Sequence, residues 1–132
     1  MRIEDYFQRL RDSVESCPAA QAFEVAYDKR STYEGFIRGA VYFLDGSTLH
    51  LREFVDAEIS PQRLMYVYQY MDAAEGLVFR YDNTGHHKDL NLSSYPDHKH
   101  EGGQKTVVAS QAPELREVLA EIELLIEPPA AP

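Results

Sequence analysis

The spacing of hydrophobic residues changes twice along this chain, from helical to alternating and back to helical. Near the N-terminus apolar residues recur every three or four positions until Pro18, which predicts a helix over residues 3–16. The same spacing returns near the C-terminus and predicts an amphipathic helix that begins near Pro113. The two stripes consist of Ile3, Tyr6, Phe7, Leu10 and Val14, and of Leu115, Val118, Leu119, Ile122, Leu125 and Ile126.

Between these helices, polar and apolar residues alternate in short runs that are typical of β-strands. Asp45 and Gly46 give the strongest hairpin signal, because both residue types tolerate the positive φ of a tight turn. Parallel strands would need long crossovers, and the connections here are short. We therefore predict an α+β domain with an N-terminal helix, an antiparallel meander sheet of about five to six strands and a C-terminal helix packed on one sheet face. The predicted strands are 22–27, 35–44, 48–55, 63–71, 77–82 and, at an edge, 105–110.

The length of 132 residues predicts one domain over 1–127, with the Pro- and Ala-rich end, 128–132, as a flexible tail. Cys17 is the only cysteine, so no internal disulfide can form. The N-terminus lacks the apolar core of a signal peptide, and no apolar run is long enough to span a membrane. These features predict a cytoplasmic protein without a membrane partner, and they leave the oligomeric state open.

The net charge of −9 disfavours non-specific binding to nucleic acid by the chain as a whole. Residues 79–105 differ from the rest, because they hold four basic and four acidic side chains and four of the five histidines. The negative excess therefore lies outside this segment. Protonated histidines would make it locally cationic, as a bound phosphate would favour.

Glu53 breaks the alternation of its strand, because period two places it on the same face as Leu49, Leu51 and Val55. One interpretation is a β-bulge, or a position past the core, that returns Glu53 to solvent. The other is an inward carboxylate that pairs with a strand arginine, for which Arg80 is the candidate. Arg80 shares a face with Asp82, where it could hold a phosphate or carboxylate ligand, or form a structural ion pair.

The histidines form two pairs, His86-His87 and His98-x-His100. An extended segment would place His98 and His100 on one side, a spacing that metal sites use, with Asp97 or Asp82 as an oxygen ligand. The spacing fits no specific metal motif, so we assign neither a metal nor a cofactor. Metal-free acid/base cleavage of RNA is a further interpretation, since it needs a base, an acid and a cation.

The tyrosines of the fourth strand, Tyr66, Tyr68 and Tyr70, share one face. They could stack a base, or they could simply pack in the core of the sheet. Both interpretations stay open at this stage.

Six segments together resemble the TumE-type toxin family of prokaryotic toxin–antitoxin pairs, over nearly the whole chain. They are IEDYF, DGSTLHLREFV, YVYQYMD, FRYDNTGHH, YPDHKH and ELREVL. The resemblance implies a small protein encoded beside an antitoxin that neutralises it by binding. Gln69 stands where the family pattern has a histidine, which puts in doubt a mechanism with a strand histidine as base.

The resemblance places the site on the Arg80 and histidine segments, and by analogy with other small α+β toxins it suggests a ribonuclease. A non-catalytic protein-binding module and a histidine-based metal-dependent hydrolase are the alternatives. We expect the cognate antitoxin, and RNA, as partners. The predicted catalytic residues are Arg80, His86, His98, Glu53 and Asp82, and the predicted substrate contacts are Tyr81, Asn83, His87, His100 and Tyr68.

Overall fold

The computed structural model describes residues 1–85, 92–102 and 106–126. Within these ranges the chain forms a helix, seven strands and a second helix, in that order. The elements are α1 (Ile3–Glu15), β1 (Ala20–Lys29), β2 (Glu34–Phe43), β3 (Thr48–Asp56), β4 (Gln62–Met71), β5 (Leu77–Asp82), β6 (His98–Glu101), β7 (Thr106–Ala109) and α2 (Leu115–Leu125).

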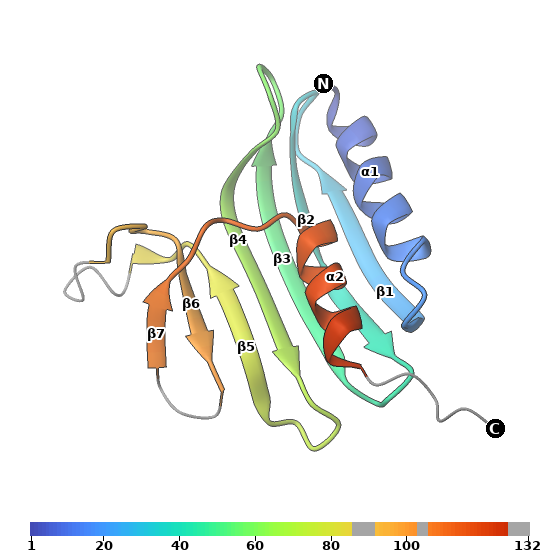
Figure 1. The fold of residues 1–132 in the computed structure, drawn as a ribbon. Coiled ribbons are helices and arrows are strands. Elements are labelled where there is room, and N and C mark those ends of the chain that lie inside the picture. The colour runs from blue at the N-terminus through green and yellow to red at the C-terminus, as the bar shows by residue number, and fades with distance from the viewer. Residues whose placement is uncertain (86–91, 103–105, 127–132) are drawn as a thin grey trace.

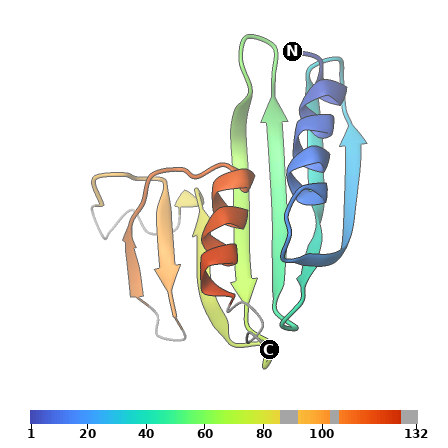
Figure 2. The ribbon, with the colours of Figure 1, turned by 45° about the vertical axis from the view of Figure 1, so that its right-hand side comes forward.

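The strands form one antiparallel sheet in the order β1-β2-β3-β4-β5-β6-β7, so each strand pairs with its neighbours in the sequence. Figures 1 and 2 show both helices on the same face of this sheet, which confirms the predicted α+β architecture. Gly46 takes a φ of 86° in the β2–β3 turn, as the hairpin signal predicts.

The core lies between the helices and this covered face of the sheet. The apolar stripe of α1 and that of α2 are buried against inward side chains of the strands. Tyr66, Tyr68 and Tyr70 belong to the core, with 2%, 0% and 3% of their surface exposed. Their shared face is therefore core packing and offers no ring for stacking a base.

The structure has more strands than the five to six predicted, because His98–Glu101 forms β6 between β5 and β7. The sequence HKHE has no alternation of polar and apolar residues, so nothing in its pattern indicates a strand. The helices begin and end within two residues of the predicted positions. The predicted tail, 128–132, lies outside the described residues.

The opposite face of the sheet carries neither helix, and we call it the open face. Strand parity places on it the side chains that alternate with the core residues. None of the helices in the described ranges is long and apolar enough to cross a membrane. The open-face residues that matter below are Phe36, Arg38, Tyr42, His50, Arg52, Phe54, Gln69, Arg80, Asp82, His98 and His100.

Candidate functional site

Asp82, at the end of β5, is the centre of a polar cluster on the open face. The strand register pairs Asp82 with His98 and Arg80 with His100, and this brings two imidazoles and a guanidinium to one carboxylate. Nε2 of His98 lies 2.8 Å from Oδ1 of Asp82, and Nε2 of His100 lies 3.5 Å from Oδ2. Nε of Arg80 donates to the same Oδ2 at 2.8 Å. We call Arg80, Asp82, His98 and His100 the Asp82 cluster.

The Asp82 carboxylate is held by more than the ionic groups. The backbone N–H of Thr84 donates to Oδ1 at 3.0 Å and the Thr84 hydroxyl at 2.9 Å, so the chain after β5 wraps around the carboxylate. Burial acts to raise the pKa of Asp82, but the hydrogen bonds from Arg80 and Thr84 outweigh burial and hold the pKa below its usual value. Asp82 is therefore a fixed negative charge for its neighbours.

The four side chains of the Asp82 cluster differ in access to solvent, and this separates their roles. Asp82 and His98 are each 1% exposed, whereas the side chains of Arg80 and His100 are 35% and 21% exposed. Nδ1 of His98 lies 2.9 Å from the carbonyl oxygen of Pro96, which can only accept, so Nδ1 carries a proton. Solvent therefore reaches Arg80 and His100, whereas Asp82 and His98 contact them from the buried side.

Asp82, His98 and His100 are also the described residues that could hold a metal ion. Their donor atoms lie within 4.8 Å of one another, and the Pro96 carbonyl turns Nε2 of His98 towards Asp82 as metal sites require. Both Asp82 oxygens already accept hydrogen bonds, and one comes from the Arg80 guanidinium. A divalent ion would have to displace some of these donors and lie beside a positive charge.

Gln69 of β4 extends this cluster, because Nη1 of Arg80 donates to its Oε1 at 3.0 Å. The register pairs Gln69 with Arg80 across β4 and β5. Gln69, which stands where the TumE-type pattern has a histidine, thus supplies an amide oxygen that orients Arg80.

Glu53 lies on the other face of the sheet, away from Arg80. It is 0% exposed, and its two oxygens accept hydrogen bonds from the hydroxyls of Tyr6 and Tyr68, the latter at 2.8 Å. The interpretation that a bulge returns Glu53 to solvent is therefore wrong, since the irregularity lies one residue later, between Phe54 and Val55.

The predicted partner of Glu53 is wrong as well. Arg80 shares the open face with Gln69, whereas Glu53 shares the covered face with Tyr68, so the sheet separates the two groups. The arginine whose charge acts on Glu53 is Arg63, and it favours the ionised carboxylate. Its Nη1 donates to the Tyr68 hydroxyl at 3.0 Å. Burial raises the pKa of Glu53, although both tyrosine hydroxyls act to lower it.

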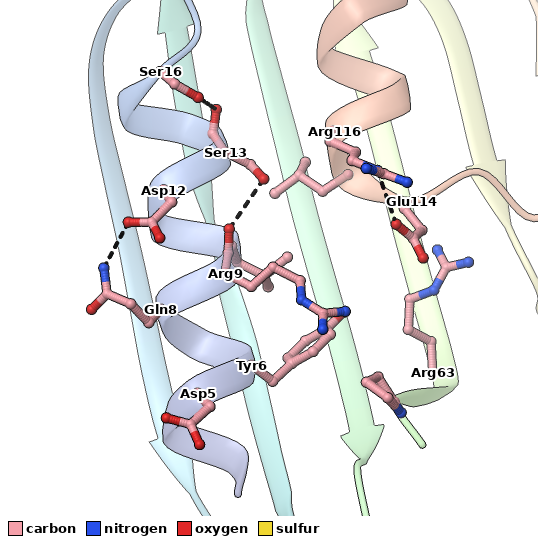
Figure 3. Close-up of a pocket in the computed structure, with 13 residues that line it drawn as sticks. Asp5, Tyr6, Gln8, Arg9, Asp12, Ser13, Ser16, Arg63, Glu114 and Arg116 are labelled. Carbon is pink, nitrogen blue, oxygen red and sulfur yellow. Dashed lines mark hydrogen bonds and ion pairs between the residues drawn. The ribbon is translucent and has the colours of Figure 1, made fainter. Parts of the chain in front are cut away.

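A groove of about 650 Å³ lies between α1 and α2, on the covered side. Figure 3 shows Tyr6 and Arg9 of α1 facing this space, with Arg63 and Arg116 across from them. Tyr6, which donates to the buried Glu53 carboxylate, and Arg63, which donates to Tyr68, both line this groove. Glu53 thus connects α1 to the sheet at the base of the groove and has no exposed atom for a substrate.

The remaining predicted contacts are spread over both faces. The Tyr81 hydroxyl donates to Glu121 of α2 at 2.5 Å, so Tyr81 belongs to the covered face. Asn83 bonds the backbone of β4, accepting from the N–H of Tyr66 at 3.0 Å and donating to the carbonyl of Leu64 at 3.2 Å. Tyr68 is buried beside Glu53. His86 and His87 lie outside the described residues, so their predicted roles stay predictions.

Sequence reasoning did not identify Tyr6, Arg63 or Thr84. Tyr6 is the one residue with a hydroxyl on an otherwise apolar helical stripe, and buried tyrosine hydroxyls usually form a hydrogen bond. Its position was therefore a signal for a polar partner in the core. Thr84 follows Asp82 by two residues, a spacing at which an aspartate accepts from the backbone ahead of it. No pattern in the sequence points to Arg63.

Comparison with known proteins gives one family. The model of the family described as Toxin TumE matches residues 7–126, which include every described member of the Asp82 cluster. No curated protein and no solved structure matches the chain.

Proposed function

The chain belongs to the TumE toxin family, and we propose that it arrests growth as a ribonuclease that cleaves RNA through the Asp82 cluster without a metal ion. Family membership makes it the toxin component of a toxin–antitoxin pair and implies a cognate antitoxin as its partner. The ribonuclease activity is our proposal, and it is supported by the chemistry that meets at Asp82.

The convergence of two imidazoles and a guanidinium on one buried carboxylate carries this proposal. In RNA cleavage the 2′-oxygen attacks phosphorus and the P–O5′ bond breaks, leaving a 2′,3′-cyclic phosphate and a 5′-hydroxyl. One group must take the 2′-hydroxyl proton, another must protonate the leaving oxygen, and a cation must stabilise the charge on the phosphoryl oxygens.

His100 and Arg80 are the exposed members of the cluster, so we assign them the roles that touch RNA. His100 exchanges a proton with the substrate, and Arg80 binds the phosphate with the guanidinium nitrogens that face solvent. Asp82 and His98 position this pair from beneath. His86, which precedes β6 and lies outside the described residues, remains the predicted second proton-transfer group.

A metal-dependent hydrolase is the second candidate, because the donor atoms of Asp82, His98 and His100 lie within 4.8 Å of one another. The two mechanisms predict opposite effects of chelation. Cleavage in EDTA supports the metal-free proposal, whereas cleavage that stops in EDTA and returns with a divalent ion supports the hydrolase.

The proposed function is tested with purified wild type and single variants on a fluorescent single-stranded RNA in EDTA. We expect His100→Gln and Arg80→Gln each to slow cleavage by about 100-fold or more. Arg116→Gln is the matched control, since Arg116 is an exposed arginine on α2, on the covered side. Growth arrest in cells should follow the same order and should vanish when the antitoxin is co-expressed.

An arrest that persists in both variants would remove the Asp82 cluster from the mechanism. Products with a 5′-phosphate and a 3′-hydroxyl would exclude attack by the 2′-oxygen, because that attack always leaves a 5′-hydroxyl, and they would end the proposed chemistry.

A further inference from the structure

Arg38 and Arg52 lie directly opposite each other on the open face, in the centre of the β2–β3 pair. Both are exposed, and among the described residues neither forms an ion pair with a carboxylate. Like charges at directly opposed positions destabilise a sheet. The pair therefore costs the free protein stability that an anion bound between the two guanidiniums would return.

The surroundings of this arginine pair are hollowed and aromatic. Two hollows of about 670 and 300 Å³ meet there, and Arg38 and Arg52 line both. Tyr42, at 38% exposure, borders the larger hollow. Phe36 borders the smaller one but is half-buried, with the Phe54 ring centroid 4.9 Å away and the Arg30 guanidinium over its ring at 5.2 Å.

Two acidic side chains, Glu24 and Asp28, also line these hollows, but in the described part of the chain neither forms an ion pair with Arg38 or Arg52. Asp28 pairs with Arg30 at 3.2 Å, and no ion pair among the described residues joins Glu24 to Arg38 or Arg52.

A row of open-face side chains links the neighbourhood of Arg38 and Arg52 to the Asp82 cluster across the strands. His50, Gln69, Arg80 and His100 follow one another across β3, β4, β5 and β6. Arg52 lies two residues along β3 from His50, and β3 is two strands from β5. Neighbouring strands are about 5 Å apart and residues rise about 3.3 Å along a strand, so the backbone of Arg52 lies roughly 12 Å from that of Arg80, a distance that about two nucleotides can bridge.

We propose that the open face is a binding track for single-stranded RNA, with phosphates on Arg38 and Arg52 and a base against Tyr42, leading to Arg80 and His100. This inference rests on the proposed function, which identifies RNA as the ligand. It adds that the RNA binds as a single strand and along which residues it lies. Cations beside exposed rings bind unpaired strands, because base stacking needs bases that are free of a duplex. The net charge of −9 repels RNA over most of the surface, including the acidic margin of the open face, so attraction is confined to the surroundings of Arg38, Arg52 and Arg80. Glu24, Asp28, Glu34 and Asp56 form that margin.

The test uses a fluorescent single-stranded DNA oligonucleotide, which has no 2′-hydroxyl and cannot be cleaved by the proposed chemistry. Anisotropy titrations over a range of salt concentrations compare wild type, Arg38→Gln/Arg52→Gln and Arg9→Gln/Arg116→Gln. The last variant is the matched control, because it makes the same charge change with exposed arginines beside the groove on the covered side.

We expect the Arg38→Gln/Arg52→Gln variant to bind at least tenfold more weakly and to lose about 1.4 from the salt slope, about 0.7 for each phosphate contact. Its thermal unfolding midpoint should equal or exceed that of wild type, since two repelling charges are gone. The control should bind like wild type, and an added duplex of the same sequence should compete poorly.

Several results would overturn the inference. Equal binding by wild type and Arg38→Gln/Arg52→Gln would do so, as would loss of binding in the control instead. Antitoxin binding that falls with Arg38→Gln/Arg52→Gln while oligonucleotide binding stays would make the open face a protein interface.

The outcomes also separate this inference from the proposed function. If the wild type cleaves RNA but the Arg38→Gln/Arg52→Gln variant binds the oligonucleotide equally well, the binding track is refuted and the ribonuclease is not. A wild type that binds through these arginines and never cleaves RNA supports the track and refutes the ribonuclease.

Discussion

Asp82 and Glu53 are both buried carboxylates, yet their neighbours shift the two pKa values in opposite directions. Asp82 accepts from a guanidinium and from Thr84, so its charged form is stabilised despite burial. Glu53 accepts from two neutral hydroxyls, and these do not offset the cost of burial. The two residues should therefore respond to pH with opposite signs.

The lowered pKa of Asp82 means that its contribution to stability is present above its usual value of 3.8 and is lost as the pH falls through the folded-state value. Asp82→Asn should cost about 2 kcal/mol of unfolding free energy at neutral pH, and the difference from wild type should narrow in acid. Urea unfolding at about pH 7 and about pH 3 measures both. The control is Asp28→Asn, an exposed residue expected to cost under about 0.5 kcal/mol. A loss that is equal at both pH values would contradict the assignment.

The raised pKa of Glu53 has the opposite consequence, because a raised value stabilises the protein below 4.5 and this contribution is lost as the pH rises through the folded-state value. Glu53→Gln should therefore lose less stability than wild type when the pH rises from about 5 to about 8. Glu53→Ala should cost about 3 kcal/mol, because it leaves a cavity and two hydroxyls without an acceptor. Urea unfolding of both, with the exposed Glu58→Gln as control, provides the measurement. If Glu53→Gln showed the pH dependence of wild type, the buried charge would have to lie elsewhere.

At the scale of elements, local sequence patterns predicted the features that depend on residues close together in the chain, namely the helices, most strands and the face on which each side chain lies. Helical spacing identified α1 and α2, and alternation identified the strands before β6 and placed Arg80 beside Asp82. Parity also predicted an inward Glu53, but not its partner, since Tyr6 lies 47 residues away in the sequence. β6 was missed because its four residues are all polar and only the register with β5 makes it a strand.

Two glycines of β2 show how closely the elements approach. A Cβ at Gly39 would lie 2.2 Å from the backbone oxygen of Glu24, whereas at Gly35 it would meet side-chain atoms of Phe7 and Ile3 at 2.5 and 2.7 Å. Backbone cannot yield as side chains do, so Gly39→Ala should cost about 3 kcal/mol and Gly35→Ala about 1 kcal/mol. Thermal unfolding followed by circular dichroism gives the order. A reversed order would show that α1, and not β1, sets the tighter limit on β2.

At the scale of the whole molecule, the sheet divides the charged chemistry into two sides. The covered face buries Glu53 and its tyrosines as part of the fold, while the open face carries Arg38, Arg52 and the Asp82 cluster. Three arginines, Arg38, Arg52 and Arg80, thus lie on one face of an acidic protein.

The family match ends at residue 126, next to the predicted end of the domain at residue 127. We expect a chain shortened to residues 1–127 to keep the unfolding free energy and the growth arrest of the full chain, because the missing residues are proline and alanine rich. Urea unfolding and growth curves of the two chains measure this. A shortened chain that unfolds at lower urea would place the end of the chain in the domain.

The sequential order of the strands also has a consequence for synthesis on the ribosome. Because each strand pairs with the one made before it, β1 to β5 can assemble while the last third of the chain is still being translated. Such a nascent chain holds Arg80 and Asp82 but lacks both histidines of β6. Under the proposed mechanism, the growing chain therefore gains activity only after β6 has been made.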